Sequence, residues 1–129
     1  MSSFIKEVKM KQGKIAVHKG FAIARFDEGA NLIAEDAEEI LAFIKETFDG
    51  PFCWLSDRIN SYSIDPTILL SMIKELPNLK AIAQTTYGNS MKDSTKIAQV
   101  YLPGDLPYKS FEELEEAIEW IEEQLASFE

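Results

Sequence analysis

Few side chains in this sequence are suited to chemistry, and they do not cluster. His18 and Cys53 are present in single copies and fall in two different predicted strands. A transition-metal site needs several nitrogen or sulfur ligands, and nucleophilic catalysis needs a base beside the nucleophile. Cys53 stands in an apolar run, where a cysteine is usually a small core residue. We therefore expect no metal, no cofactor and no enzymatic activity; a remote alternative is an enzyme that uses Asp57, Arg58 and Ser63.

The remaining polar residues of interest gather in one stretch, Asp57 to Thr67. An apolar run, 52–55, precedes it, and an amphipathic run, 68–73, follows it. Asp65 before Pro66 marks a helix start, because the carboxylate accepts from free backbone N–H groups and proline has no N–H to leave unpaired. We predict an exposed loop between a strand end and a helix N-terminus, a common place for ligands and modifications in α/β folds. The residues expected to form a partner-binding or anion-binding loop are Asp57, Arg58, Asn60, Tyr62 and Asp65.

Composition and charge narrow the class of protein. With 129 residues, 46% of them hydrophobic and 27% charged, the sequence predicts one globular domain over residues 1–129. The net charge is −9, and eight glutamates with no Lys or Arg lie from Glu112 onward. Such a tail repels nucleic acid, and no basic cluster elsewhere compensates. No apolar run reaches the ~18–20 residues of a membrane helix, the start lacks a signal-peptide core, and a single cysteine suits a reducing compartment. We expect a cytoplasmic protein without membrane insertion.

Hydrophobic periodicity predicts an α/β fold. Residues 4–26 contain three short alternating segments separated by glycine turns, which predicts an antiparallel meander. The later segments alternate strand and helix, which favours parallel strands with right-handed crossovers and about four helices packed on a mixed sheet. Helices are expected over 34–48, 66–76, 91–101 and the region that follows a capping box from Ser110 to Glu113, and strands over 52–56, 79–87 and 108–109.

Several aromatic residues could line a cavity for an apolar or amphiphilic ligand, although core packing is the simpler role for them. They are Trp54, Tyr62, Tyr87, Tyr101 and Trp120. The acidic face of the last helix is interpreted as a solvated surface rather than a docking site. The sequence leaves open whether the chain forms a homodimer.

The order of the elements and two sequence segments resemble STAS domains, in particular the SpoIIAA-like branch that is also labelled STAS/SEC14. The segments are Leu55-Ser56-Asp57 … Ile64-Asp65-Pro66-Thr67-Ile68-Leu69-Leu70 and the terminal helix Phe111 … Ala117-Ile118-Glu119-Trp120. The resemblance covers nearly the whole chain. It implies a SpoIIAA-like mixed sheet and a bacterial, non-catalytic regulatory module that binds a protein partner, as anti-sigma-factor antagonists do.

The resemblance also implies a possible phosphorylation site. In phosphorylatable STAS domains a partner kinase modifies the second of two hydroxyl residues that open the helix after the central strand. Thr67 occupies that position here, and Ser63 and Ser61 are nearby substitutes, while Pro66 replaces the first hydroxyl residue. The partner would then be a kinase or a regulator.

The SEC14 half of the family label implies an alternative function, the carriage or sensing of a small lipid-like ligand between helix and sheet. The lining expected for such a ligand consists of Phe43, Met72, Tyr87 and Met91.

Overall fold

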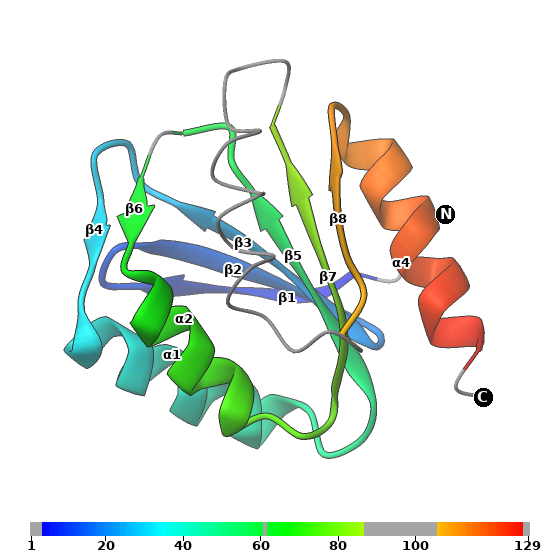
Figure 1. Ribbon diagram of the computed structural model, residues 1–129, viewed down its shortest axis with the longest axis horizontal. Coiled ribbons are helices and arrows are strands. Elements are labelled where there is room, and N and C mark those ends of the chain that lie inside the picture. The colour runs from blue at the N-terminus through cyan, green and yellow to red at the C-terminus, as the bar shows by residue number, and fades with distance from the viewer. Residues whose placement is uncertain (1–3, 61, 87–105, 128–129) are drawn as a thin grey trace.

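The chain folds into a mixed sheet that carries helices on both faces (Figure 1). The structure is a computed structural model that describes residues 4–60, 62–86 and 106–127. The strands are β1 (Phe4–Met10), β2 (Gly13–His18), β3 (Phe21–Phe26), β4 (Asn31–Leu32), β5 (Phe52–Asp57), β6 (Ser63–Ile64), β7 (Leu79–Thr85) and β8 (Tyr108–Phe111). The helices are α1 (Ala34–Thr47), α2 (Pro66–Lys74) and α4 (Leu114–Ala126).

In the described part of the chain, the main sheet has six strands in the order β1-β2-β3-β5-β7-β8. β1, β2 and β3 pair antiparallel, which confirms the predicted meander. β3, β5, β7 and β8 pair parallel, so the expected crossovers are present. The carboxyl ends of these four strands therefore meet at one edge of the sheet, where α/β folds commonly place their binding sites.

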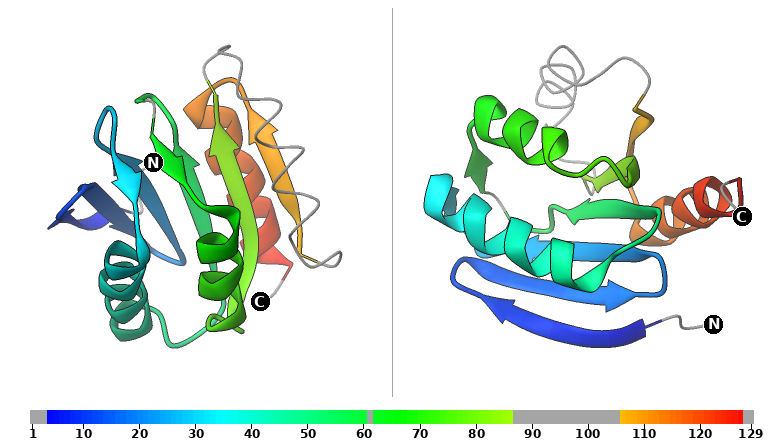
Figure 2. Two further views of the ribbon diagram at one scale, coloured as in Figure 1. Left: turned by 60° about the vertical axis from the view of Figure 1, so that its left-hand side comes forward. Right: turned by 90° about the horizontal axis from the view of Figure 1, so that it is seen from below.

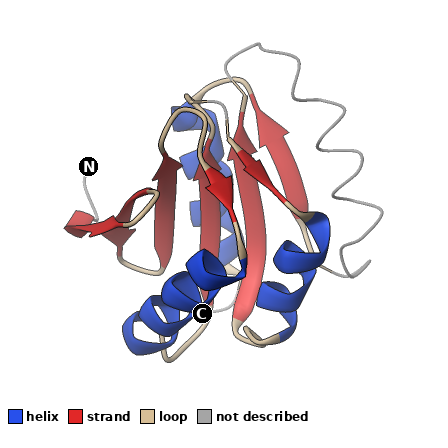
Figure 3. Cartoon of the chain, turned by 90° about the vertical axis from the view of Figure 1, so that its left-hand side faces the viewer, coloured by secondary structure: helices blue, strands red, loops and turns tan. Residues whose placement is uncertain are grey.

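The helices cover opposite faces of the sheet, as Figures 2 and 3 show, with α1 and α2 on one face and α4 on the other. The core beneath α1 and α2 contains large side chains such as Phe52 and Ile82. The core beneath α4 contains Ala81, Ala83 and Ala117, all fully buried. The small side chains of β7 allow α4 to lie close to the sheet.

A second sheet, which the sequence did not predict, pairs β4 with β6 in parallel. Asn31 lies opposite Ser63, and Leu32 lies opposite Ile64. Strands of two residues are too short to show a periodic pattern, so no sequence signal announces them. This pairing fixes the segment after β5 against the segment before α1 and orders part of the predicted loop.

The number of helices in the described residues and the start of the last helix differ from the predictions, whereas α1 begins at Ala34 and α2 at Pro66, as expected. The described residues contain three helices, and the expected fourth, over 91–101, lies outside them. The prediction of a capping box from Ser110 to Glu113 is wrong. Parallel pairing with β7 keeps the backbone extended through Phe111, so α4 begins only at Leu114. Here strand pairing overrides a local capping pattern. At α1 the N-cap is Ile33, whose N–H donates to the Asp36 carboxylate at 3.0 Å.

Candidate functional site

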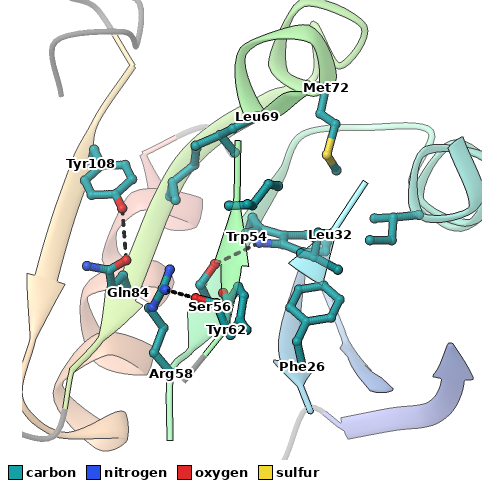
Figure 4. Close-up of a pocket in the computed structure, with 13 residues that line it drawn as sticks. Phe26, Leu32, Trp54, Ser56, Arg58, Tyr62, Leu69, Met72, Gln84 and Tyr108 are labelled. Atoms are coloured by element: carbon teal, nitrogen blue, oxygen red, sulfur yellow. Dashed lines mark hydrogen bonds between the residues drawn. The ribbon is translucent and has the colours of Figure 1, made fainter. Parts of the chain in front are cut away.

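A cavity of about 70 Å³ lies between α2 and the sheet, near the carboxyl ends of the parallel strands (Figure 4). Its wall combines apolar side chains with a smaller polar set. The apolar residues are Phe26, Leu32, Ile40, Trp54, Ile64, Leu69, Met72 and Ile82. The polar residues are Ser56, Arg58, Tyr62, Gln84 and Tyr108. Ligand sites typically have this composition, with a mostly apolar lining and a few polar groups that set orientation.

The sheet itself arranges the change from apolar to polar lining. Alternate residues of a strand point to the same face, so Trp54 and Ser56 of β5 both line the cavity, and Arg58 follows them just past the strand end. On β7 the same alternation places Ile82 and then Gln84 in the wall. Along both strands the lining therefore becomes polar toward the carboxyl edge, and the cavity has an apolar body and a polar end.

Arg58 is the cationic group of the polar end. Its guanidinium carbon lies 4.2 Å from the centre of the Tyr62 ring, and its Nη2 donates to the Tyr62 carbonyl at 2.9 Å. Its Nε is buried and has no hydrogen-bond partner among the described residues. A buried donor without a partner costs about 1–3 kcal/mol, so this atom is a natural contact point for a bound molecule or a water.

Two tyrosines and two hydrogen-bonded pairs complete the polar end. Burial raises the pKa of Tyr62, more than the neighbouring Arg58 charge lowers it. Burial also raises the pKa of Tyr108 to about 12, so both phenols stay protonated at neutral pH. The Tyr108 hydroxyl donates to Gln84 Oε1 at 3.2 Å, and Trp54 Nε1 donates to Ser56 Oγ at 3.2 Å (Figure 4).

The start of α2 has the geometry expected from the sequence. Asp65 is the N-cap, and its Oδ1 accepts from the Thr67 backbone N–H at 2.8 Å and from the Thr67 hydroxyl at 2.7 Å. These hydrogen bonds lower the pKa of Asp65. Pro66 occupies the first helical position. Thr67 is exposed, so its hydroxyl lies at the surface on the first turn of the helix.

The other predicted residues of the 57–67 stretch have separate places. Ser63 is exposed in β6, and its hydroxyl donates to Asn31 Oδ1 at 3.0 Å. Asn60 donates from Nδ2 to the Phe26 carbonyl at 3.1 Å, which holds the turn against β3. Ser61 lies outside the described residues. The stretch is therefore divided between a surface part around Thr67 and a part that lines the cavity, Arg58 and Tyr62.

Asp57 does not belong to an exposed loop, contrary to the prediction. It is the last residue of β5, its side chain is 1% exposed, and it forms an ion pair with Arg25 of β3. Thr85 Oγ1 donates to its other oxygen at 2.9 Å. Asp57 lies on the α4 side of the sheet, because residues 53, 55 and 57 alternate with the cavity-lining residues. Its carboxylate supports the sheet and is not available to a partner.

The predicted ligand-lining residues divide in the same way. Trp54, Tyr62 and Met72 line the cavity. Trp120 lies on the other side of the sheet, 5.8 Å from the Phe111 ring, and Phe43 lies beside a different surface cleft. Tyr87, Met91 and Tyr101 lie outside the described residues. Gln84 and Tyr108 also line the cavity and were not predicted from the sequence, although the alternation along residues 79–85 contained the signal for Gln84.

Groups suited to metal binding or nucleophilic chemistry are not assembled in the parts of the chain that the structure describes. Those residues contain no group of three or more His, Cys, Asp or Glu side chains placed to hold a metal. Cys53 is fully buried, and burial raises the pKa of its thiol to about 11. His18 stacks on Phe21 with ring centres 4.6 Å apart, and burial lowers its pKa. No helix of the described ranges is long and apolar enough to cross a membrane.

The strand order, the antiparallel N-terminal meander and the helices on both faces define a SpoIIAA-like α/β fold, which confirms the fold class predicted from the sequence. The chain is similar in structure to an uncharacterized protein of the DUF3478 family from Shewanella loihica PV-4, whose fold is described as SpoIIAA-like. The match covers 94% of this chain and 95% of that chain, with a TM-score of 0.58 and 17% sequence identity. At this identity the likeness shows the fold alone. No protein-family model and no curated protein matches the sequence.

Proposed function

We propose that this protein is a non-catalytic binding module that holds a small amphiphilic molecule in the cavity between α2 and the sheet. The observation that carries the proposal is the composition of the cavity wall. Leu69 and Met72 of α2 face Trp54 across an apolar space, and Arg58 with Gln84 forms a polar end. A molecule with both an apolar part and a polar group would satisfy both ends of this cavity.

The volume of the cavity limits the size of the ligand. One water molecule needs about 10–15 Å³ of such space, so 70 Å³ accommodates roughly five to seven atoms of that size. Sites for drug-sized molecules typically enclose about 300–1,000 Å³. The proposed occupant is therefore a compact amphiphile or the end of a longer one, and a complete two-chain lipid is too large.

Native mass spectrometry of the protein purified from its own cells tests this proposal. We expect a retained mass on the wild-type protein, and we expect it to be lost in the variant Leu69→Phe, which adds volume to the cavity wall from α2. Leu70→Phe, a half-buried position on the same helix that does not line the cavity, is the matched control. A retained mass that is equal in all three proteins would place the ligand elsewhere and refute the assignment of the cavity.

A second candidate function, a phosphorylation-switched protein interaction at Thr67, is supported by a different observation. The exposed Thr67 hydroxyl lies beside an open groove of about 240 Å³ between α1 and α2, where Glu38 and Glu75 also line the wall. A phosphate would add about −1.5 to −2 charges next to the Asp65 carboxylate that caps the helix. Repulsion would then weaken the cap and alter the start of α2, which a partner such as a kinase or regulator could sense.

Phosphopeptide mapping of the protein from its own cells tests the second candidate. We expect one phosphate on Thr67 and its loss in Thr67→Ala. Ser71→Ala is the matched control, because Ser71 is an exposed hydroxyl in the same groove. A phosphate on Ser63 or Ser61 would leave the loop as the switch but refute the role of Thr67, and an unmodified loop would refute the switch itself.

A further inference from the structure

The chain contains two arginines, and their environments are opposite. Arg25 donates from its Nε to Asp57, so its charge is neutralised by a buried carboxylate. Arg58 forms no ion pair with any carboxylate in the described ranges, although it is partly buried. A guanidinium cannot lose its proton at any ordinary pH, so the polar end of the cavity carries a permanent positive charge.

The guanidinium of Arg58 is also held in place before any ligand arrives. The Tyr62 ring supports its face at 4.2 Å, and the Tyr62 carbonyl accepts from Nη2 at 2.9 Å. These contacts leave the buried Nε–H without a partner among the described residues. A fixed guanidinium with an unused donor is well suited to an oxyanion, because charge-assisted hydrogen bonds from arginine to carboxylates are strong and directional.

We propose that the cavity binds a short-chain carboxylate, with the carboxylate on Arg58 and the hydrocarbon chain against Leu69, Met72 and Ile82. This inference rests on the proposed function of the cavity and names the chemical class of its ligand. The phenols of Tyr62 and Tyr108 stay neutral, so they add hydrogen-bonding capacity to the polar end without opposing the anion. The 70 Å³ volume matches an acid of about six non-hydrogen atoms, such as butanoate.

Titrations followed by NMR test this inference, with butanoate, its neutral isostere butanamide, and inorganic phosphate as probes. The two reporters are the Nε–H signal of Arg58 and the indole N–H signal of Trp54. The variant Trp120→Phe assigns the Trp54 signal, because it leaves Trp54 as the one tryptophan of the chain. We expect butanoate to shift both signals and to bind at least tenfold more tightly than butanamide. Phosphate, which has no hydrocarbon chain, should bind at least tenfold more weakly than butanoate.

Variants separate the role of Arg58 from a general loss of structure. Arg58→Gln should weaken butanoate binding at least tenfold, and Arg58→Lys, which keeps the charge, should retain part of it. Lys74→Gln removes an exposed charge at the end of α2 and should leave the affinity unchanged. Equal binding of butanamide and butanoate, or full binding by Arg58→Gln, would overturn the carboxylate while leaving the cavity as a binding site. Phosphate binding as tight as that of butanoate would overturn the need for a hydrocarbon chain. If no probe shifts the Trp54 signal, the proposed function of the cavity fails as well.

Discussion

The two partners of the Arg25–Asp57 ion pair differ in burial, and this difference predicts which of them is more costly to remove. The Asp57 side chain is 1% exposed, whereas the Arg25 side chain is 32% exposed. Without Arg25, the carboxylate would remain in the core, where the Thr85 hydroxyl donates to it. Without Asp57, the guanidinium could still reach water. Arg25→Met should therefore destabilise the protein more than Asp57→Asn does.

The expected magnitudes follow from the burial of each partner. Leaving a charge uncompensated in the core costs about 3–5 kcal/mol, which is the expectation for Arg25→Met. Asp57→Asn keeps an acceptor for Thr85 but loses a charge-assisted hydrogen bond, at a cost of roughly 1.5–3 kcal/mol. The double variant Arg25→Met/Asp57→Leu removes both charges and should cost less than Arg25→Met alone, because no buried charge is left.

Urea unfolding at pH 7, followed by tryptophan fluorescence, measures these free energies of unfolding. Lys14→Met is the surface control: Lys14 and Glu7 lie 4.0 Å apart with 53% and 45% of their side chains exposed, and such pairs contribute at most ~1 kcal/mol. The reasoning is refuted if Asp57→Asn costs more than Arg25→Met. It is also refuted if the double variant costs the sum of the two single changes.

Two further predictions concern titrating groups. Burial raises the pKa of Cys53 to about 11, so iodoacetamide at pH 8 should modify the native protein far more slowly than the urea-unfolded protein. Intact-mass measurements at timed intervals check this prediction. Equal rates of modification would contradict the burial of the thiol. The pKa of Asp65 is lowered by its hydrogen bonds with Thr67, so its contribution to stability is present above the pKa of the unfolded chain and is lost as the pH falls through the folded pKa. Asp65→Ala should therefore lower the melting temperature at pH 7 and have little effect on it in strong acid. If the wild type and the variant still differ in melting temperature in acid, the carboxylate charge is not the cause.

The sequence predicts the fold well where a single segment decides its own structure. The meander of residues 4–26 follows from period-two alternation and glycine turns, and the start of α2 follows from Asp65 and Pro66. The predictions fail where a distant segment decides. Ser110 and Glu113 form a good local capping pattern, but pairing with β7 holds Phe111 in a strand. Local propensity is a weak constraint compared with a strand pairing of this kind.

The candidate site shows the same division between local and distant information. The sequence identifies the 57–67 stretch as the region of interest, but a polar stretch does not show which side chains turn inward. Asp57 reads as a loop residue because no local feature reveals Arg25, which is 32 positions away and supplies its ion pair. Six strands and two helices contribute side chains to the cavity wall, so Tyr108 could join Arg58 only once the sheet was assembled.

The two faces of the sheet are packed in different ways, and this difference explains why the cavity lies beneath α2. Beneath α4 the strand β7 presents the small side chains of Ala81 and Ala83, and the helix packs directly on them, beside larger side chains of β3 and β5 such as Ile23 and Leu55. Beneath α2 the strands present Trp54 and Ile82, whose bulk separates the helix from the sheet.

Among the helices that the structure describes, α2 has the fewest buried side chains. Met72 is buried, whereas Ile68, Leu69, Leu70 and Ile73 are half-buried. Elements with few buried apolar side chains are the ones that open locally at low cost in free energy. Exchange of a ligand would therefore proceed by displacement of α2 while the sheet stays intact. A phosphate on Thr67 would act on the first turn of the same helix, so both proposed functions depend on how firmly α2 is held against the sheet.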